Sequence, residues 1–254
     1  LLAARAAGRA APALGVAGVL LGVLTVTRGE GLLVAAVCAA WAAAVARRRI
    51  DVEPLRAALL VLVPVLVFIA PVFVRNTFLE GDPVVVSWNG GINLFMGNDP
   101  GFDQTSGNWN PDLAWMRLYR APRQLGLTRG SDHQDFFVRQ TVRAVLHHPL
   151  RFAGLLGRKA LLLCTGYEIS NNQRIYDACR LSPVLAPLLW KTRWFAFPFG
   201  LAAPLALAGL ILGGRAGARA ALPLLLIAAA TAVVPVLFFN TARYRLPARP
   251  AGDS

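Results

Sequence analysis

The sequence predicts an all-α polytopic membrane protein of about five transmembrane helices, with an extracytoplasmic loop domain that contains interfacial helices. Three observations predict this class. Hydrophobic residues make up 56% of the 254 residues and charged residues only 15%, which is too apolar for a water-soluble domain of this size. Long runs without charge alternate with short joints that carry arginine. Between residues 75 and 194 the composition changes to that of a soluble or interfacial domain, with nine acidic residues.

Charge-free runs near the length that crosses the hydrocarbon core, about 20 residues, are the candidate spans. Five such runs are present: residues 10–27, 31–46, 57–74, 195–214 and 220–242. The second run is short and rich in alanine, but the tight joint at residues 28–30 favours a helical hairpin with the first. The prolines inside the spans are tolerated in membrane bundles and predict kinks.

The spans divide the chain into three parts. Residues 1–74 form three transmembrane helices, residues 75–194 form the extracytoplasmic segment, and residues 195–254 form two transmembrane helices and an outer-face Arg-Tyr-Arg tail. This orientation follows from the arginines at residues 47–56 and 215–219, because basic residues in short loops stay in the cytoplasm. The chain starts at Leu1 without a signal peptide, and we expect it to be a fragment of a longer protein.

The net charge of +13 does not point to nucleic acid, because the arginines lie between apolar spans and not on one surface with interleaved aromatic residues. The cysteines and histidines show no zinc-ligand spacing, and no motif for nucleotide binding, metalloprotease or serine hydrolase chemistry occurs. No cofactor is therefore identified, although a divalent metal in the intact protein stays an open alternative.

Residues 83–100 combine a β-branched run with Asn-Gly-Gly and Gly-Asn-Asp-Pro turns. We expect an extended segment followed by a glycine-rich loop. Asn89, Asn93 and Asn98 in this loop are candidates to face a sugar or an acceptor. The alternative is a connector in which glycine and asparagine only supply turns.

Two helices are expected in the second half of the extracytoplasmic segment. The first begins at an N-cap Ser131 and runs to residue 148, where Pro149 stops it and starts the next helix. The next helix, residues 150–165, is apolar but is interrupted by Arg158 and Lys159. It is too short and too charged to span a membrane, and we expect it to lie at the membrane interface.

Cations cluster where the spans meet the predicted outer interface. Arginine presents a planar fork of donors to phosphate oxygens, so this set predicts binding of a lipid-linked phosphate or pyrophosphate. If residues 243–245 are extended, their two arginines lie on one side about 7 Å apart. The alternative is that the cations reach ordinary lipid headgroups. The donor-phosphate candidates are Arg28, Arg75, Arg158, Lys159, Arg243 and Arg245.

Four stretches in this order resemble the C-terminal half of bacterial GT-C glycosyltransferases, in the branch of protein O-mannosyltransferases and lipid A aminoarabinose transferases. They are APVFVRN at residues 70–76, VSWNGGINLFMGN at 86–98, YEISNN at 167–172 and ARYRLP at 242–247. Glu168, in the third stretch, joins the asparagines as a sugar or acceptor candidate.

The resemblance implies transfer of a sugar from a polyprenyl-phosphate donor to an acceptor glycan, lipid or protein. The reaction would take place on the extracytoplasmic face of the bacterial cytoplasmic membrane, with membrane lipids as further partners and no nucleic acid. The catalytic base of this family lies in the first outer loop, which we expect upstream of Leu1. No catalytic residue is therefore assigned, and we expect the chain alone to have no transferase activity.

Two other functions are open at the level of sequence. One is a non-catalytic transporter or scaffold whose outer domain binds glycan or lipid, and the other is a lipid-linked oligosaccharide ligase. A transporter would favour ionisable residues or broken helices near the middle of the membrane. The five predicted spans contain no Asp, Glu, Lys or Arg, and this favours transfer at the interface.

Overall fold

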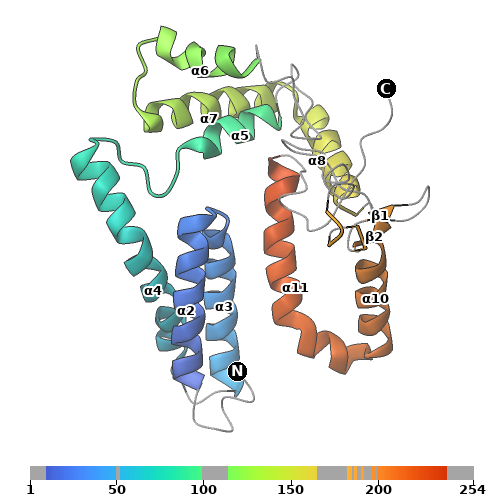
Figure 1. The fold of residues 1–254 in the computed structure, drawn as a ribbon. Coiled ribbons are helices and arrows are strands. Elements are labelled where there is room, and N and C mark those ends of the chain that lie inside the picture. Colours follow the sequence, from blue (N-terminus) through green and yellow to red (C-terminus); the bar gives the residue numbers. More distant parts are fainter. Residues whose placement is uncertain are drawn as a thin grey trace. The chain divides into compact units, whose positions relative to one another are not determined.

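The computed structural model describes residues 10–49, 52–98, 114–164 and 199–238, and in addition residues 182–184, 186–187, 190–191 and 196–197. The regular secondary structure of this part is helical apart from one antiparallel pair of two-residue strands, β1 (Trp190–Lys191) and β2 (Ala196–Phe197) (Figure 1). The chain forms two compact units. The first comprises Leu1–Trp88 with Leu222–Thr231, and the second comprises Asn89–Ala221 with Ala232–Ser254.

The first unit is built on the helices α2 (Ala10–Thr27), α3 (Gly31–Arg49) and α4 (Pro54–Val74). The predicted hairpin of α2 and α3 is confirmed, because the two helices pack against each other on either side of the short joint between them. α2 also packs closely on α4 at Gly18, where a Cβ atom would lie 2.7 Å from the carbonyl oxygen of Val61. Glycine thus lets the two backbones approach, as small residues do between membrane helices.

α4 begins at a well-defined cap. The carboxylate of Glu53 accepts hydrogen bonds from the backbone N–H groups of Leu55 at 3.0 Å and Arg56 at 2.8 Å, and Pro54 occupies the first helical position. At its other end α4 continues into a short π-helix, η1 (Arg75–Leu79). The apolar helix therefore extends over 26 residues, from Pro54 to Leu79.

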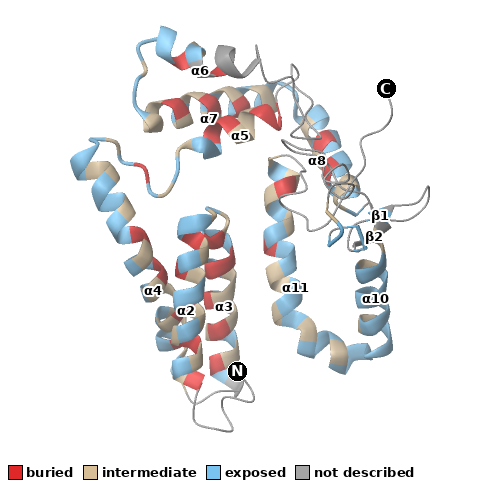
Figure 2. Ribbon diagram, in the orientation of Figure 1, coloured by how far each residue is buried: buried red, intermediate tan, exposed pale blue. Residues whose placement is uncertain are grey.

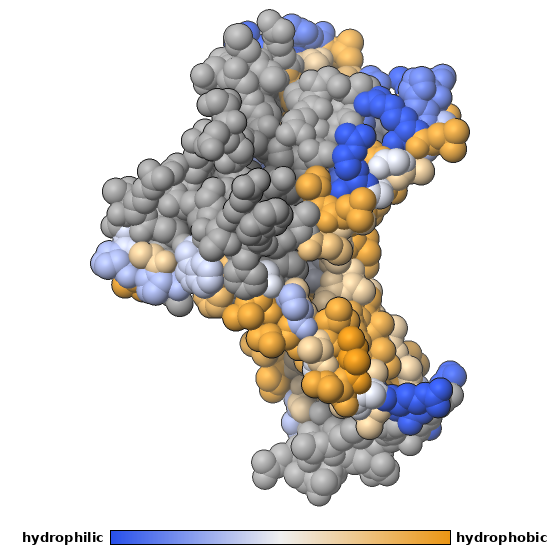
Figure 3. Space-filling view, turned by 90° about the vertical axis from the view of Figure 1, so that its right-hand side faces the viewer, coloured by the Kyte–Doolittle hydropathy of each residue, from blue (hydrophilic) through white to orange (hydrophobic). Residues whose placement is uncertain are grey.

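The buried residues of the first unit are mostly small, whereas large apolar side chains face outwards. Ala42, Ala57 and Val61 are at most 1% exposed, but Leu20 and Leu66 are 65% and 61% exposed. Figure 2 shows exposed residues along these helices. On the face drawn in Figure 3, which is the side of α10 and α11 in Figure 1, the described surface also carries many hydrophobic residues. Exposed leucine and valine on this scale are compatible with a hydrocarbon environment.

The second unit contains the helices α5 (Asn89–Met96), α6 (Ala114–Gln124), α7 (Gly130–His147), α8 (Pro149–Cys164) and α10 (Phe199–Leu212). It also contains both ends of α11 (Gly214–Leu237). α5 packs on α7, and together with α6 they bury a small apolar core. The core residues are Ile92, Met96, Leu118 and Phe137.

The prediction of a glycine-rich loop over residues 89–98 was wrong, because most of this segment is α5. Its Gly91 lies so close to α7 that a Cβ atom would overlap the carbonyl oxygen of Gln134. Gly91 therefore permits close helix packing instead of supplying a turn. Burial of Ile92 and Met96 outweighs the low helix propensity of the glycines.

The next two helices follow the prediction except at one cap. α7 ends at His147 and α8 begins at Pro149, so the proline break is confirmed. The N-cap of α7 is Arg129, without a side-chain hydrogen bond, and the prediction of a Ser131 cap was wrong.

Three helices of the described chain are long and apolar enough to cross a membrane: Ala10–Thr27, Pro54–Leu79 and Gly214–Leu237. Two further apolar helices, Gly31–Arg47 and Gly200–Leu212, are shorter. The structure is thus compatible with a helical membrane protein. Helices form at all five predicted spans, but the count of five crossings, the three-part division and the orientation stay predictions.

Candidate functional site

A polar cleft of about 350 Å³ lies where the long apolar helix of α4 and η1 ends. All its lining residues come from one short stretch, residues 75–88, in the first unit. The cleft combines one cation, two carboxylates, an amide, a hydroxyl and an indole ring. These residues are Arg75, Asn76, Glu80, Asp82, Val84, Val86, Ser87 and Trp88.

The local sequence folds the chain back on the helix end. Gly81 has a φ of 67°, in the left-handed region that glycine adopts without a steric penalty, and it reverses the chain after η1. Asn76 then fastens the returning segment. The side-chain Nδ2 of Asn76 donates to the carbonyl oxygen of Val84 at 2.9 Å, and the backbone carbonyl oxygen of Asn76 accepts from the backbone N–H of Asp82 at 2.9 Å.

The charged groups of the cleft are paired but exposed. Arg75 Nη2 lies 2.7 Å from Glu80 Oε1, with 62% and 55% of the two side chains exposed, and Arg75 Nη1 donates to Asn76 Oδ1 at 3.3 Å. An exposed pair of this kind contributes little to stability. The guanidinium can therefore exchange the carboxylate for another oxyanion.

The remaining groups suit a polyhydroxylated ligand. The carboxylates of Glu80 and Asp82 accept hydrogen bonds from hydroxyl groups, and either can take a proton from one. The indole of half-buried Trp88 offers an apolar surface with a polar edge. In the described part of the chain no group of three or more His, Cys, Asp or Glu side chains is placed to hold a metal ion.

The other candidates of the first unit and of α5 lie in different surroundings. Arg28 pairs with Glu30 at 2.6 Å in the joint between α2 and α3, outside the cleft lining. Asn89 is exposed and Asn93 is half-buried, both on α5. Arg243, Arg245 and Glu168 lie outside the described residues.

Two predicted candidates meet in the second unit. The ammonium of Lys159, on α8, is fully buried and donates to Asn98 Oδ1 at 2.9 Å and to the carbonyl oxygen of Phe238 at 2.6 Å. Asn98 Nδ2 donates to the carbonyl oxygens of Leu94 at 2.7 Å and Leu237 at 2.8 Å. Lys159 and Asn98 thus tie α5 and α8 to the C-terminal end of α11, where a cation is favoured by the helix dipole.

Burial lowers the pKa of Lys159 from its ordinary value of 10.5 to about 8. Its neighbour Arg158 is exposed on another side of α8. Two consecutive cations that looked alike in the sequence therefore have opposite surroundings. Lys159 binds protein oxygens in this structure, whereas Arg158 is accessible to an external anion.

Glu80, Asp82 and Trp88 were not predicted from the sequence as site residues. A signal was present, because a Glu-Gly-Asp-Pro turn follows a charge-free span and precedes a tryptophan within a few residues. Such a turn returns the chain to the helix end, where Glu80 pairs with Arg75 and Asp82 lines the same cleft.

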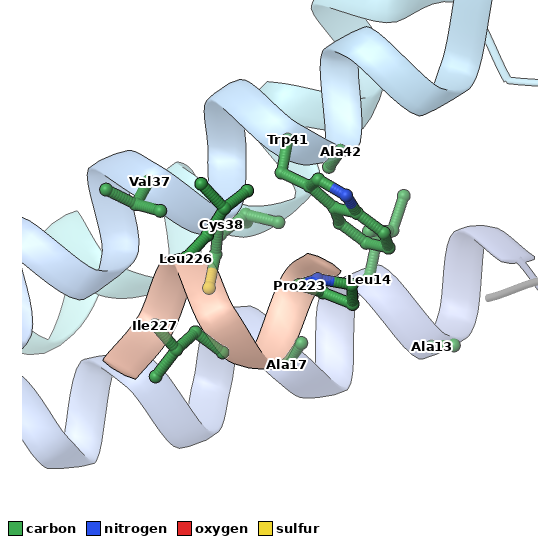
Figure 4. A pocket seen from close by; sticks show the side chains of 11 residues that line it. Ala13, Leu14, Ala17, Val37, Cys38, Trp41, Ala42, Pro223, Leu226 and Ile227 are labelled. Carbon is green, nitrogen blue, oxygen red and sulfur yellow. The ribbon is translucent and has the colours of Figure 1, made fainter. Parts of the chain in front are cut away.

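The first unit also contains an apolar cavity of about 290 Å³. Side chains of α2, α3 and α4 line it together with Pro223, Leu226 and Ile227 of α11. Figure 4 shows Trp41, Cys38 and Leu226 around it. The lining offers no charged group, so the cavity suits a hydrocarbon group and not the chemistry of a reaction.

Comparison of the chain with protein-family models, with curated proteins and with solved structures finds no match.

Proposed function

We propose that the cleft at the end of α4 is the donor site of a membrane glycosyltransferase, which moves a sugar from a polyprenyl phosphate to an acceptor on the extracytoplasmic face. One observation carries the proposal: Arg75, Glu80, Asp82 and Trp88 line a single polar cleft at the end of a 26-residue apolar helix. A polyprenyl-phosphate sugar has the matching order of parts, with a hydrocarbon chain, then an anion, then a set of hydroxyl groups.

In this proposal the lipid chain lies along the apolar helices and the phosphate is bound by Arg75. The guanidinium exchanges Glu80 for the phosphate and presents two parallel donors to its oxygens. Cationic donors at this position stabilise the charge that develops on the phosphate as the sugar leaves. Glu80, Asp82 and Trp88 then surround the sugar.

The placement of charge supports a transferase over a transporter. The predicted spans contain no ionisable residue, whereas a substrate path through the membrane favours such residues near its middle. We place residues 75–194 on the outer face of a bacterial cytoplasmic membrane, with five crossings, as part of the same proposal. The four stretches that resemble GT-C glycosyltransferases support this assignment, and Arg75 lies in the first of them.

The test is binding of undecaprenyl phosphate, the part that donors of this class share, to the chain in neutral lipid nanodiscs. Arg75→Gln should weaken binding about 10- to 100-fold, because one charge-assisted contact is lost, and Arg75→Lys should restore only part of it. The matched control is Arg139→Gln. Arg139 belongs to another exposed pair, with Asp135 at 3.2 Å and side chains 70% and 64% exposed.

Uncharged undecaprenol measures the contribution of the hydrocarbon chain alone, and its affinity should be the same in all variants. Equal affinity of wild type, Arg75→Gln and Arg139→Gln for undecaprenyl phosphate would remove Arg75 from the donor site. In membranes that carry the full-length protein, Arg75→Gln should also lower sugar transfer. Normal binding of the lipid without any transfer would favour a binding scaffold instead.

A further inference from the structure

We infer that one face of α8 binds the headgroups of anionic phospholipids. We define this α8 face by Leu150, Leu161, Arg151 and Arg158, all of which are exposed. Figure 2 shows exposed residues along α8. The inference goes beyond the proposed function, because it concerns the lipid that surrounds the protein and not the donor. It holds or fails whether or not the cleft at Arg75 binds a polyprenyl phosphate.

The apolar part of the face is a stripe along the helix. Leu150 is 87% exposed and Leu161 is 72% exposed. Eleven residues separate them, which at about 100° per residue returns to within about 20° of the same direction. The exposed Gly154 and Gly157 lie between them on the same stripe. Two leucines this exposed on one line are unfavourable in water and indicate a partner surface.

The basic part of the face runs beside this stripe. Arg151 and Arg158 lie seven residues apart, and therefore on the same side of the helix, about 10 Å from each other along its axis. They point roughly 90° away from the leucines, whereas the buried Leu155 and Lys159 lie on the opposite side. Cations at the edge of an apolar stripe are the arrangement of a helix that lies in a membrane interface.

The charge of the surrounding segment selects an anionic partner. Residues 136–164 contain no Asp or Glu but five Arg and Lys residues. The last part of α7 also presents a basic and an apolar side chain to the surface, because Arg143 is exposed and Leu146 is 74% exposed. The two arginines of the α8 face lie about 10 Å apart along the helix axis, a spacing that lets each contact a different headgroup.

The experiment measures lipid contact directly. Cys38, Cys164 and Cys179 of the whole chain are replaced by serine, Leu150→Cys is introduced, and an environment-sensitive fluorophore is attached. The chain is reconstituted in phosphatidylcholine vesicles with the same mole fraction of brominated phosphatidylcholine or brominated phosphatidylglycerol. Leu125→Cys, 67% exposed in the turn after α6, is the control position.

We expect quenching at position 150 by both lipids, with brominated phosphatidylglycerol at least about twice as effective as brominated phosphatidylcholine. The reason is that a cation near the membrane surface binds an anionic headgroup severalfold more strongly than a neutral one. Arg151→Gln with Arg158→Gln should bring this ratio close to one, whereas Arg215→Gln with Arg219→Gln should leave it unchanged. Far-UV circular dichroism verifies that each variant is folded.

Three results would overturn the inference. The first is no quenching at position 150, which would place the face in water or against an acidic protein partner. The second is equal quenching by both lipids in the chain with its arginines intact. The third is loss of quenching as the protein density rises, which would show that a second copy covers the face.

Discussion

The buried ammonium of Lys159 predicts an unusual dependence of stability on pH, which Lys159→Met tests. Burial lowers the pKa of this lysine to about 8, against an ordinary value of 10.5. Below pH 8 the group is charged in the folded and the unfolded chain, so the unfavourable burial of charge is present in full. Between pH 8 and 10.5 only the unfolded chain holds the proton, and the free energy of unfolding therefore rises with pH. The depression corresponds to about 3 kcal/mol.

Methionine fills a similar volume but carries no proton and donates no hydrogen bond. The oxygens of Phe238 and Asn98 then lose this donor, at about 1–3 kcal/mol each, while the carbonyl of Leu237 keeps its bond from Asn98 Nδ2 at 2.8 Å. Near pH 7 this loss is offset because no charge is buried. Near pH 10 nothing offsets this loss. The free energy of unfolding of the variant, relative to wild type, should therefore be about 3 kcal/mol lower at pH 10 than at pH 7.

The assay is equilibrium unfolding in detergent micelles at several pH values between 7 and 10.5, for wild type, Lys159→Met and the control Lys191→Met. Because the chain contains only these two lysines, [ε-13C]lysine labelling also gives two signals, and Lys191→Arg identifies them. The Lys159 signal should titrate near pH 8. A midpoint near 10.5, or unfolding free energies of wild type and Lys159→Met that change in parallel with pH, would refute the reasoning.

Three further predictions use the same chain. Gly91→Ala should destabilise the second unit by about 1–3 kcal/mol, because the new Cβ atom would overlap the carbonyl oxygen of Gln134. Gly90→Ala should be neutral or stabilising, since the nearest atom to its Cβ is Gln134 Oε1 at 3.9 Å. Equal thermal midpoints of the two variants would contradict this packing. The N–H groups of Leu55 and Arg56 lower the pKa of Glu53 below its ordinary 4.5. Glu53→Gln should therefore unfold at a lower temperature than wild type at pH 7, and the difference should disappear as the pH falls below 4.5. A difference in melting temperature that persists in acid would count against the cap. In intact cells a thiol reagent that cannot cross the membrane should label Leu125→Cys but not Arg215→Cys, and the reverse pattern would invert the proposed orientation.

The apolar helices between charged joints were predictable because a long run of apolar residues has few other stable forms in an apolar environment. α2, α4 and α8 lie within a few residues of their predicted ranges. α5 was not predictable, because its Gly-Gly pair has the composition of a turn. The close approach of α7 at Gly91 makes it a helix, and a contact between residues 91 and 134 leaves no trace in local sequence.

The site was predictable only in part, for a similar reason. Arg75 was found because it is the first cation after a span. The role of Glu80 and Asp82 depends on the left-handed turn at Gly81 and on the amide of Asn76, which bring the chain back to the helix end. Sequence spacing alone does not distinguish this return from an extended linker, so the carboxylates were counted only as part of a polar segment.

Arg75 and Lys159 show why a cation at the edge of an apolar stretch does not by itself reveal its role. A guanidinium keeps its charge at any accessible pH, so burial without a matched anion is unfavourable, and Arg75 stays exposed beside Glu80. An ammonium is compact and can lose its proton when it is desolvated, so Lys159 tolerates a site made of two carbonyl oxygens and an amide oxygen. The first arrangement leaves a cation that can exchange its partner for a phosphate. In the second arrangement the cation binds oxygens of the protein itself and is not available to a ligand. Donor binding should therefore respond to Arg75→Gln, whereas the pH dependence of unfolding should respond to Lys159→Met.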